Sequence, residues 1–254
     1  MNSYCEHIDI NCDLGEGVSI EDCVRDAALM PFISRCNIAC GGHAGNDTTM
    51  AQSVANALKF TLAIGAHPGY PDRENFGRKS LTISRQKLLK SISEQVESLS
   101  AAAARAGAKL DHIKLHGALY NDAESDPSLA AAIVTMIRDN YPHLKILCLA
   151  NAAMECAALD TGHPFLREGF MDRRYQNDHQ LAPRSQQGAV IEDFSECLQQ
   201  TMSLIRGGRF TSVSGKPLSF TVDSICLHGD NPQAAQIASR LHQALQEAGI
   251  RIRL

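Results

Sequence analysis

The sequence carries little net charge and contains no long apolar run, and each absence excludes a class of partner. Its 254 residues include 24 Lys and Arg against 28 Asp and Glu, which gives a formal net charge of -4. Proteins that hold DNA, RNA or an anionic membrane electrostatically present basic surfaces, so we expect no nucleic acid or membrane partner. No run approaches the roughly 18 apolar residues of a membrane-spanning helix. The first residues also lack the basic and apolar regions of a secretion signal, which predicts a cytoplasmic protein.

Cysteine motifs for redox chemistry or structural zinc are missing as well. The nine cysteines include no C-x-x-C, and an odd number cannot pair completely. This usage is typical of reduced, buried cysteines in a cytosolic protein. Cys36 and Cys40 form the closest pair, C-x3-C, and we interpret them as packing residues rather than zinc ligands.

Three common catalytic signatures are also absent. Residues 208–216 approximate a P-loop but continue with Pro217, where that loop needs Ser or Thr. The G-x-G that begins at Gly15 has Ile20 where a dinucleotide-binding fingerprint needs its third glycine, and no G-x-S-x-G occurs. The sequence therefore argues against a P-loop ATPase, a Rossmann oxidoreductase and an α/β-hydrolase.

What the sequence does contain is a regular alternation of strand and helix patterns. Short apolar or alternating runs predict strands at residues 7–12, 33–40, 61–66, 111–115, 144–150, 164–170 and 222–227. Between them, apolar residues recur every three or four positions, as at Leu88, Ile92 and Val96. Strand followed by helix about seven times predicts a parallel α/β sheet, closed as a barrel or open and doubly wound. No linker divides the chain, so we expect a single domain over residues 1–254.

Polar residues collect directly after six of the predicted strands. They are Asn11, Asp13 and Glu16; His43; His67, Asp72 and Arg73; Lys114 and His116; Asp172 and Arg173; and His228 and Asp230. In a parallel α/β protein these strand ends lie on one face, where such folds build their active sites. Taken singly, a histidine is more often structural than functional, and an acidic residue beside glycine usually belongs to a turn. The convergence of six segments nevertheless favours a functional site.

These residue types suit the attack of water on a carbonyl-like carbon. That reaction needs a base, an acid and groups that stabilise an oxyanion. Asp13, His67 and His116 could supply the base and the acid, or could hold a metal ion that does both. Lys114 and Arg173 are candidates for binding anionic groups of the substrate, as is Arg73. Spacing alone does not choose between these possibilities.

The loop after the third strand is dense in prolines and charges. It lies within residues 64–78, IGAHPGYPDRENFGR. Because prolines restrict its backbone, we expect Asp72, Arg73 and Arg78 to be held over the mouth of the site. In the alternative, Asp72, Arg73 and Glu74 form a salt-bridged staple within the loop.

Several blocks of the sequence resemble the successive motifs of one protein family. They are DINCDLGEG, NIACGGHAGN, IGAHPGYPDRENFGR, HIKLHGALYN, DRRYQNDHQLAPRSQQGAVIED and ICLHGD. In this order, from residue 9 to residue 230, they are similar to the LamB/YcsF family, so the resemblance covers nearly the whole chain. The resemblance implies that the α/β fold is a seven-stranded (β/α) barrel. This barrel is TIM-like and of the type found in glycoside hydrolases and deacetylases.

The resemblance also implies a function. It is the ATP-dependent opening of the lactam ring of 5-oxoproline to L-glutamate, by a three-component 5-oxoprolinase that includes subunits B and C. In that arrangement the partners use ATP to phosphorylate the lactam and this chain hydrolyses the activated ring, which fits the missing P-loop. The implied catalytic residues are Asp13, His67, Lys114 and His116. Three of them, Asp13, His67 and His116, are similar to the Asp-His-His metal ligands of related deacetylases, which implies a divalent metal.

Further residues in or beside the matching blocks are expected to bind substrate. They are Asn11, Glu16, His43, Asp72, Arg73, Asp172, Arg173, Arg184, His228 and Asp230. Two other functions remain open. The chain could be a stand-alone metal-dependent deacetylase or amidohydrolase that needs neither ATP nor partners, or a non-catalytic subunit that presents the ring to a partner enzyme. A homo-oligomer is compatible with each of them.

Overall fold

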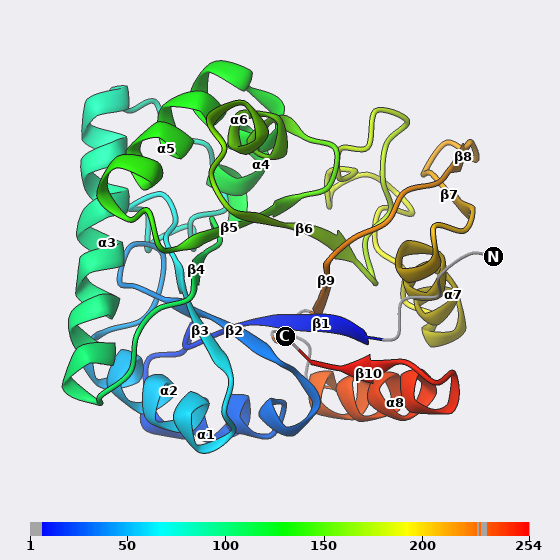
Figure 1. Ribbon diagram of the computed structural model, residues 1–254, viewed down its shortest axis with the longest axis horizontal. Helices are drawn as coiled ribbons and strands as arrows, with labels where there is room; N and C mark the ends of the chain where they lie inside the picture. Colours follow the sequence, from blue (N-terminus) through cyan, green and yellow to red (C-terminus); the bar gives the residue numbers. More distant parts are fainter. Residues whose placement is uncertain (1–6, 228, 230–232, 254) are drawn as a thin grey trace.

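The computed structural model describes residues 7–227, 229 and 233–253, and its centre is a closed barrel of parallel strands (Figure 1). Over these residues the barrel consists of seven strands: β1 (His7–Leu14), β2 (Arg35–Ala39), β3 (Ala63–His67), β4 (His112–Ile113), β5 (Lys145–Leu149), β6 (Phe165–Phe170) and β9 (Ser224–Leu227). Each strand pairs in parallel with the next. β9 closes the ring on β1, where Cys226 lies opposite Asn11. The seven expected strands are therefore confirmed, and the sheet is a closed barrel rather than doubly wound.

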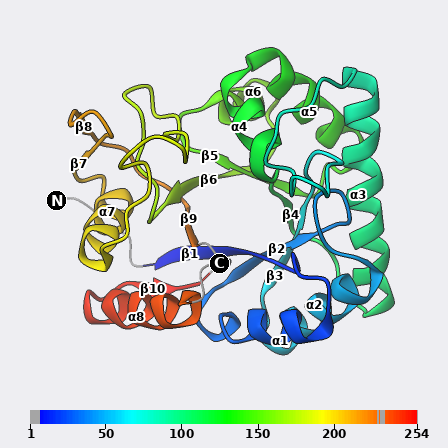
Figure 2. The same ribbon diagram turned by 180° about the vertical axis from the view of Figure 1, so that it is seen from behind.

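Helices cover the outside of the barrel, as Figure 1 and the reverse view in Figure 2 show. They are α1 (Ile20–Ala27), α2 (Asp47–Lys59), α3 (Arg85–Arg105), α4 (Gly117–Ser125), α5 (Pro127–Asn140), α6 (Ala153–Thr161), α7 (Phe194–Arg206) and α8 (Ala234–Glu247), with a 3-10 turn η1 (Met30–Phe32). A hairpin of β7 (Phe210–Thr211) and β8 (Pro217–Leu218) follows α7, and β10 (Arg251–Ile252) pairs with the start of β1. Among the described helices, none combines the length and the apolar character that crossing a bilayer requires.

Local sequence signals mark the starts of α5 and α3. The carboxylate of Asp126 accepts hydrogen bonds from the first amides of α5, which starts at Pro127. Ser84 caps α3 in the same way. The apolar stripe predicted for α3, which includes Ile92 and Val96, is fully buried. Packing of such stripes against the strands stabilises the outer shell of the fold.

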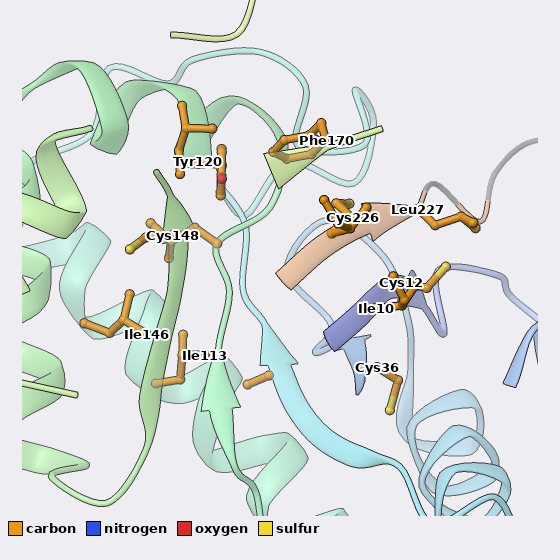
Figure 3. Packing of buried hydrophobic residues seen from close by; sticks show 14 of the residues in the cluster. Ile10, Cys12, Cys36, Ile113, Tyr120, Ile146, Cys148, Phe170, Cys226 and Leu227 are labelled. Atoms are coloured by element: carbon orange, nitrogen blue, oxygen red, sulfur yellow. The ribbon is translucent and has the colours of Figure 1, made fainter. Parts of the chain in front are cut away.

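Strand β1 shows how the core is divided. Ile10 and Cys12 belong to the hydrophobic cluster shared by strands and helices, part of which Figure 3 shows. The alternate residues Asn11 and Asp13 instead contact polar side chains from other strands. Successive side chains of a strand point to opposite faces. The apolar core therefore lies between strands and helices, whereas polar side chains fill the inside of the barrel.

Strand β4 is shorter than the predicted segment 111–115, but the chain stays beside β3 after it ends. The amide of Lys114 donates to the carbonyl of Ala66 at 2.9 Å. The amide of His116 donates to the carbonyl of Pro68, also at 2.9 Å. These two bonds carry Lys114 and His116 to the carboxyl end of the barrel.

Candidate functional site

A cavity of about 400 Å³ opens at the carboxyl ends of the barrel strands. The four side chains expected to be catalytic all line it: Asp13, His67, Lys114 and His116. They come from the ends of three different strands, and Phe170 adds the end of β6. The convergence inferred from the sequence is thus present in the fold, at the end of the barrel where (β/α) barrels place their active sites.

Backbone carbonyls fix the protonation of two of these histidines. Nδ1 of His67 lies 2.9 Å from the carbonyl oxygen of Lys114, and Nε2 of His116 lies 2.9 Å from that of Phe76. A carbonyl oxygen can only accept, so each of these nitrogens carries the proton. In the neutral rings, the lone pairs of His67 Nε2 and His116 Nδ1 then face each other at 3.0 Å.

His43 and Glu16 complete a compact cluster with these two rings. His43 is stacked on His116, with ring centroids 3.5 Å apart and planes 2° from parallel. Oε1 of Glu16 lies 3.0 Å from His43 Nε2 and 3.1 Å from His116 Nδ1. One ligand atom from each of Glu16, His43, His67 and His116 lies within 4.8 Å of the others. One carboxylate and three imidazoles therefore form a possible site for a divalent metal.

This ligand set differs from the expected one. Asp13 was expected beside His67 and His116, and its Oδ2 does lie 3.3 Å from His67 Nε2. Its other oxygen, Oδ1, accepts hydrogen bonds from Lys114 and from the amide of Asn37, at 2.9 and 2.8 Å. Glu16, whose carboxylate faces the imidazoles, occupies the place in the cluster that the sequence assigned to Asp13.

Lys114 is a buried cation held between carboxylates. Its Nζ lies 2.9 Å from Asp13 Oδ1, 2.8 Å from Glu168 Oε1, 3.1 Å from Asn11 Oδ1 and 3.2 Å from Cys226 Sγ. Burial lowers the pKa of Lys114, but the neighbouring Asp13, Cys226 and Glu168 outweigh burial and raise it well above its usual value. Lys114 is therefore a fixed positive charge at the base of the cavity.

The same contacts set the ionisation of the neighbouring groups. Burial raises the pKa of Asp13, but His67 and Lys114 overcome this and hold it well below the ordinary range. Burial lowers the pKa of His67, yet the Asp13 carboxylate more than compensates and the pKa is raised. Burial lowers the pKa of His43 to about 4. At neutral pH, Asp13 is thus an ionised carboxylate, and His43 is a neutral ring.

A column of polar side chains inside the barrel orients Asp13. Arg35 Nη1 lies 3.0 Å from His112 Nδ1, and His112 Nε2 lies 2.6 Å from Asn37 Oδ1. The amide nitrogen of Asn37 in turn donates to Asn11 Oδ1 at 2.9 Å and to Asp13. Burial lowers the pKa of His112 to about 4, so the ring is neutral at pH 7. With its orientation fixed, Asn37 can only present donors to Asp13 and Asn11.

The loop after β3 closes over the histidines. The ring of Phe76 packs edge-on against His43 and His116, with centroid distances of 5.5 and 5.4 Å. Gly77 follows at φ +61°, and a Cβ placed there would lie 2.8 Å from the Cβ of His43. The close approach of this loop therefore depends on the missing side chain at residue 77.

Two charged residues of this loop do not lie where the sequence suggested. Arg73 is exposed, is not part of the cavity lining, and donates to the carbonyl oxygens of Gly41, at 2.9 Å, and Gly45. The carboxylate of Asp72 accepts both hydrogen bonds of the Asn75 amide nitrogen, at 3.0 and 2.9 Å. Arg73 thus ties its loop to the glycine-rich turn after β2, because nearby carbonyls satisfy its guanidinium.

The other expected substrate-binding residues divide into three groups. Glu16, Arg173 and Arg184 line the cavity, together with Arg78. Asn11, His43 and Asp172 are not among the lining residues: Asn11 supports Lys114 from inside the barrel, and His43 lies behind His116 in the stack. His228 and Asp230 lie outside the described residues.

Sequence reasoning missed Glu168 and Tyr120. Glu168 is fully buried in β6, and its Oε2 accepts a hydrogen bond from the hydroxyl of Tyr120 at 2.9 Å. Tyr120 lines the cavity from α4. The sequence did contain a signal for Glu168. An acidic residue in the middle of a predicted strand, rather than at its end, indicates a side chain on the polar inner face of the barrel.

Comparison with known proteins agrees with the geometry. The model of the LamB/YcsF family matches residues 8–254. The chain is 45% identical over 243 residues to the A subunit of 5-oxoprolinase from Erwinia tasmaniensis, covering 96% of this chain and 97% of that protein. It is 41% identical over 245 residues to the protein of the same name from Bordetella pertussis, again covering 96% and 97%.

Solved structures show the same fold. The lactam utilization protein from Thermus thermophilus superposes with a TM-score of 0.89 at 32% identity, covering 97% of this chain and 99% of that one. A putative cellobiose-phosphate cleavage protein from Enterococcus faecalis has a TM-score of 0.58 at 14% identity, covering 98% and 97%, and so shares the fold alone. With its motifs, its barrel and these relatives in agreement, this chain belongs to the LamB/YcsF family.

Proposed function

We propose that this chain is a hydrolase subunit that opens the lactam ring of 5-oxoproline to give L-glutamate. Its relatives are named as a 5-oxoprolinase component and a lactam utilization protein, which supports this substrate. The observation that carries the proposal is the ionised Asp13 at the cavity, held between Lys114 and His67. Such a carboxylate can take a proton from water beside a cationic group and imidazoles, as amide hydrolysis requires.

In the proposed reaction Asp13 acts as the general base. A water molecule gives one proton to the Asp13 carboxylate while its oxygen bonds to the ring carbonyl carbon. The carbon–nitrogen bond of the ring then breaks, and the leaving nitrogen takes up a proton. Asp13, which holds the proton taken from the water, lines the cavity and returns that proton to the nitrogen. Lys114 supplies the positive charge that favours negative charge on the carbonyl oxygen.

ATP enters through partner subunits in this proposal. A five-membered lactam is a resonance-stabilised amide, and transferring a phosphoryl group to its oxygen makes the ring carbon more electrophilic. Addition of water and cleavage of the ring bond would then leave a glutamyl phosphate, which a second water hydrolyses to glutamate and phosphate. The relatives are named as one lettered component of their enzyme, which supports a multi-subunit assembly, and we assign ATP use to its subunits B and C.

The cluster of Glu16, His43, His67 and His116 fits a divalent ion, and we propose that it holds one. Lone pairs of His67 and His116 face each other beside the Glu16 carboxylate, an arrangement of acceptors that a cation would satisfy. Nε2 of His43 lies 3.0 Å from the same carboxylate oxygen of Glu16. An ion bound there would polarise a carbonyl oxygen or acidify a water molecule.

The same cluster favours one alternative, a stand-alone amidohydrolase or deacetylase. The deciding experiment measures glutamate release from 5-oxoproline by the purified chain, with and without ATP and with and without the two partner subunits. We expect product only when ATP and all three proteins are present. Amide hydrolysis by the chain alone without ATP would support the alternative, and a complete mixture without product would contradict the substrate.

A variant distinguishes catalysis from simple presentation of the ring. His116→Ala removes a ring that lines the cavity and contacts both Glu16 and His67. In the complete mixture we expect glutamate release to fall by at least about 100-fold, the size of a typical general acid–base contribution. Turnover close to that of the wild type would instead indicate a non-catalytic, substrate-presenting subunit.

A further inference from the structure

The described lining of the cavity includes a buried cation without a counter-ion. Arg173 follows β6, lines the cavity and is only 6% exposed. Nη2 of its guanidinium donates to the carbonyl oxygen of Ala182 at 2.6 Å, but its Nε is buried and has no hydrogen-bond partner in the described part of the chain. Among the described residues, no carboxylate lies within ion-pair distance of it. An unpaired buried charge is strongly unfavourable, so this position needs an anion that these residues do not supply.

A second arginine adds to the positive charge at this point. Arg184 lines the same cavity from the connection between β6 and α7. Burial lowers the pKa of Arg173 and the charge of Arg184 lowers it further, and the neighbouring Asp172 carboxylate, which raises it, does not outweigh them. A buried and an exposed arginine therefore line one cavity. Such an arrangement is typical of a site that binds an anionic ligand between or beside them.

The acidic groups of the cavity cannot serve as this anion. The Asp13 carboxylate is bound by Lys114 and His67, and that of Glu16 lies within the histidine cluster, 3.0 Å from His43 Nε2. The carboxylates on the β1 side of the cavity thus already have their places, Asp13 with Lys114 and Glu16 with the histidines, and neither is paired with an arginine. A ligand that brings its own negative charge would complete the second side.

We propose that Arg173, with Arg184 beside it, is the subsite for the carboxylate of the lactam substrate. The choice of ligand rests on the proposed function, because 5-oxoproline carries one carboxylate on the ring carbon next to nitrogen. That group is planar and accepts the in-plane hydrogen bonds that a guanidinium donates. Binding it here would place the ring between the arginines and the Asp13 side of the cavity. Arg173 then selects amino-acid lactams against simple lactams that lack the carboxylate.

The test compares two ligands that differ in this group alone. The dissociation constants of 5-oxoproline and of 2-pyrrolidinone, the same ring without a carboxylate, are measured by calorimetry with the full chain. For the wild type we expect 5-oxoproline to bind at least about tenfold more tightly than 2-pyrrolidinone, because one charge-assisted hydrogen bond contributes at least that much to affinity. Arg173→Gln should bring this ratio close to one, and Arg173→Lys, which keeps the charge without Nε, should give an intermediate ratio.

The neighbouring arginine provides a matched control. Arg174 pairs with Glu196 at 2.7 Å and does not line the cavity, so Arg174→Gln should keep the wild-type ratio. A purely structural role for Arg173 predicts a lower melting temperature in Arg173→Gln with an unchanged ligand ratio. We expect the reverse, a melting temperature at or above that of the wild type and a lost preference. An unchanged preference in Arg173→Gln overturns the proposal.

A wrong substrate assignment would give a different result from a wrong assignment of Arg173. If the wild type binds neither lactam and the complete mixture with ATP releases no glutamate from 5-oxoproline, 5-oxoproline is not the ligand, and glutarate then serves as the carboxylate probe. Thermal stabilisation of the wild type by glutarate, absent in Arg173→Gln, would keep a carboxylate subsite at Arg173. No stabilisation by glutarate, or a larger one by inorganic phosphate that also depends on Arg173, would overturn it.

Discussion

Nζ of Lys114 lies 2.8 Å from Oε1 of Glu168, and this ion pair joins two strands that are not neighbours across the inside of the barrel. Both side chains are almost entirely buried, with 3% and 0% exposure. The pair works as part of a triad, because the same ammonium also binds Asp13. Lys114 therefore compensates two buried carboxylates, one of which we assign as the general base.

Replacing Lys114 should damage stability and activity together. Lys114→Met leaves Asp13 and Glu168 without their cation, and breaking a buried pair typically costs about 3–5 kcal/mol in free energy of unfolding. Urea denaturation at pH 7 measures this loss. The control is Lys145→Met, which removes a half-exposed ammonium paired with Asp111 and should cost at most about 1 kcal/mol.

A second substitution tests the cause of that loss. Adding Glu168→Gln to Lys114→Met removes one of the two uncompensated charges, so the double variant should recover part of the stability that the single variant loses. If the two changes were simply additive, or if Lys114→Met were as mild as Lys145→Met, the buried-charge explanation would be wrong.

The histidine cluster predicts a measurable metal content. We expect the chain, purified without chelators, to retain about one divalent ion, as a carboxylate with three imidazoles can hold. His116→Ala should lose most of this ion when elemental analysis is repeated. His163→Ala is the control, because His163 is equally buried but bonds to the carbonyl of Leu144 away from the cavity. Wild-type protein without metal, whose activity also survives chelation, would contradict the site.

Replacing a glycine by alanine should destabilise the protein more in the loop over the histidines, at Gly77, than at Gly107. Gly77 and Gly107 both have positive φ, +61° and +74°, so alanine at either should cost about 1–2 kcal/mol in backbone strain. At Gly107 a Cβ would meet no described atom within 4 Å, whereas at Gly77 it would lie 2.8 Å from the Cβ of His43. Gly77→Ala should therefore cost about 1–3 kcal/mol more, as overpacking does, and also depress turnover. If urea denaturation shows equal losses of free energy of unfolding for the two variants, and turnover is normal, the loop can move to accept the added methyl group.

The fold was predictable because its signals are local and repeated. Each barrel strand coincides with a short apolar or alternating run, and Asp126 with Pro127 marks the start of α5 directly. The gathering of His67 and His116 was also predictable, since parallel strands carry their carboxyl ends to one face. These conclusions need only periodicity and topology.

Details of the site depend on distances that periodicity does not give. Arg73 could have reached the cavity, but carbonyl oxygens of Gly41 and Gly45 lie closer and satisfy it. Glu16 belongs to the histidine cluster, whereas Asp13 lies beside it with one oxygen bound by Lys114 and Asn37, a division that residue spacing does not encode. Glu168 was hidden because a buried acid within a strand has no turn or glycine to mark it.

The polar column at the amino end of the barrel contains an ion pair whose strength depends on pH. Arg35 is buried and pairs with Asp9 at 2.8 Å and with Asp111. Burial raises the pKa of Asp111, but the charge and hydrogen bond of the Arg35 guanidinium outweigh it and hold the pKa well below that of a free aspartate. A depressed pKa in the folded state stabilises the protein above the unfolded pKa of about 4, and this contribution is lost as pH falls below that value.

Removing the Asp111 carboxylate should therefore destabilise the protein at neutral pH and much less in acid. Asp111→Asn should lower the free energy of unfolding by about 1–2 kcal/mol at pH 7, a discounted figure because the carboxylate is partly exposed and Arg35 keeps Asp9. The difference from the wild type should shrink as urea denaturation is repeated from pH 5 to pH 3. Asp139→Asn, which removes an exposed partner of Arg138, should change little at any pH. A deficit in Asp111→Asn that stays constant down to pH 3 would mean that lost packing, rather than the ion pair, causes it.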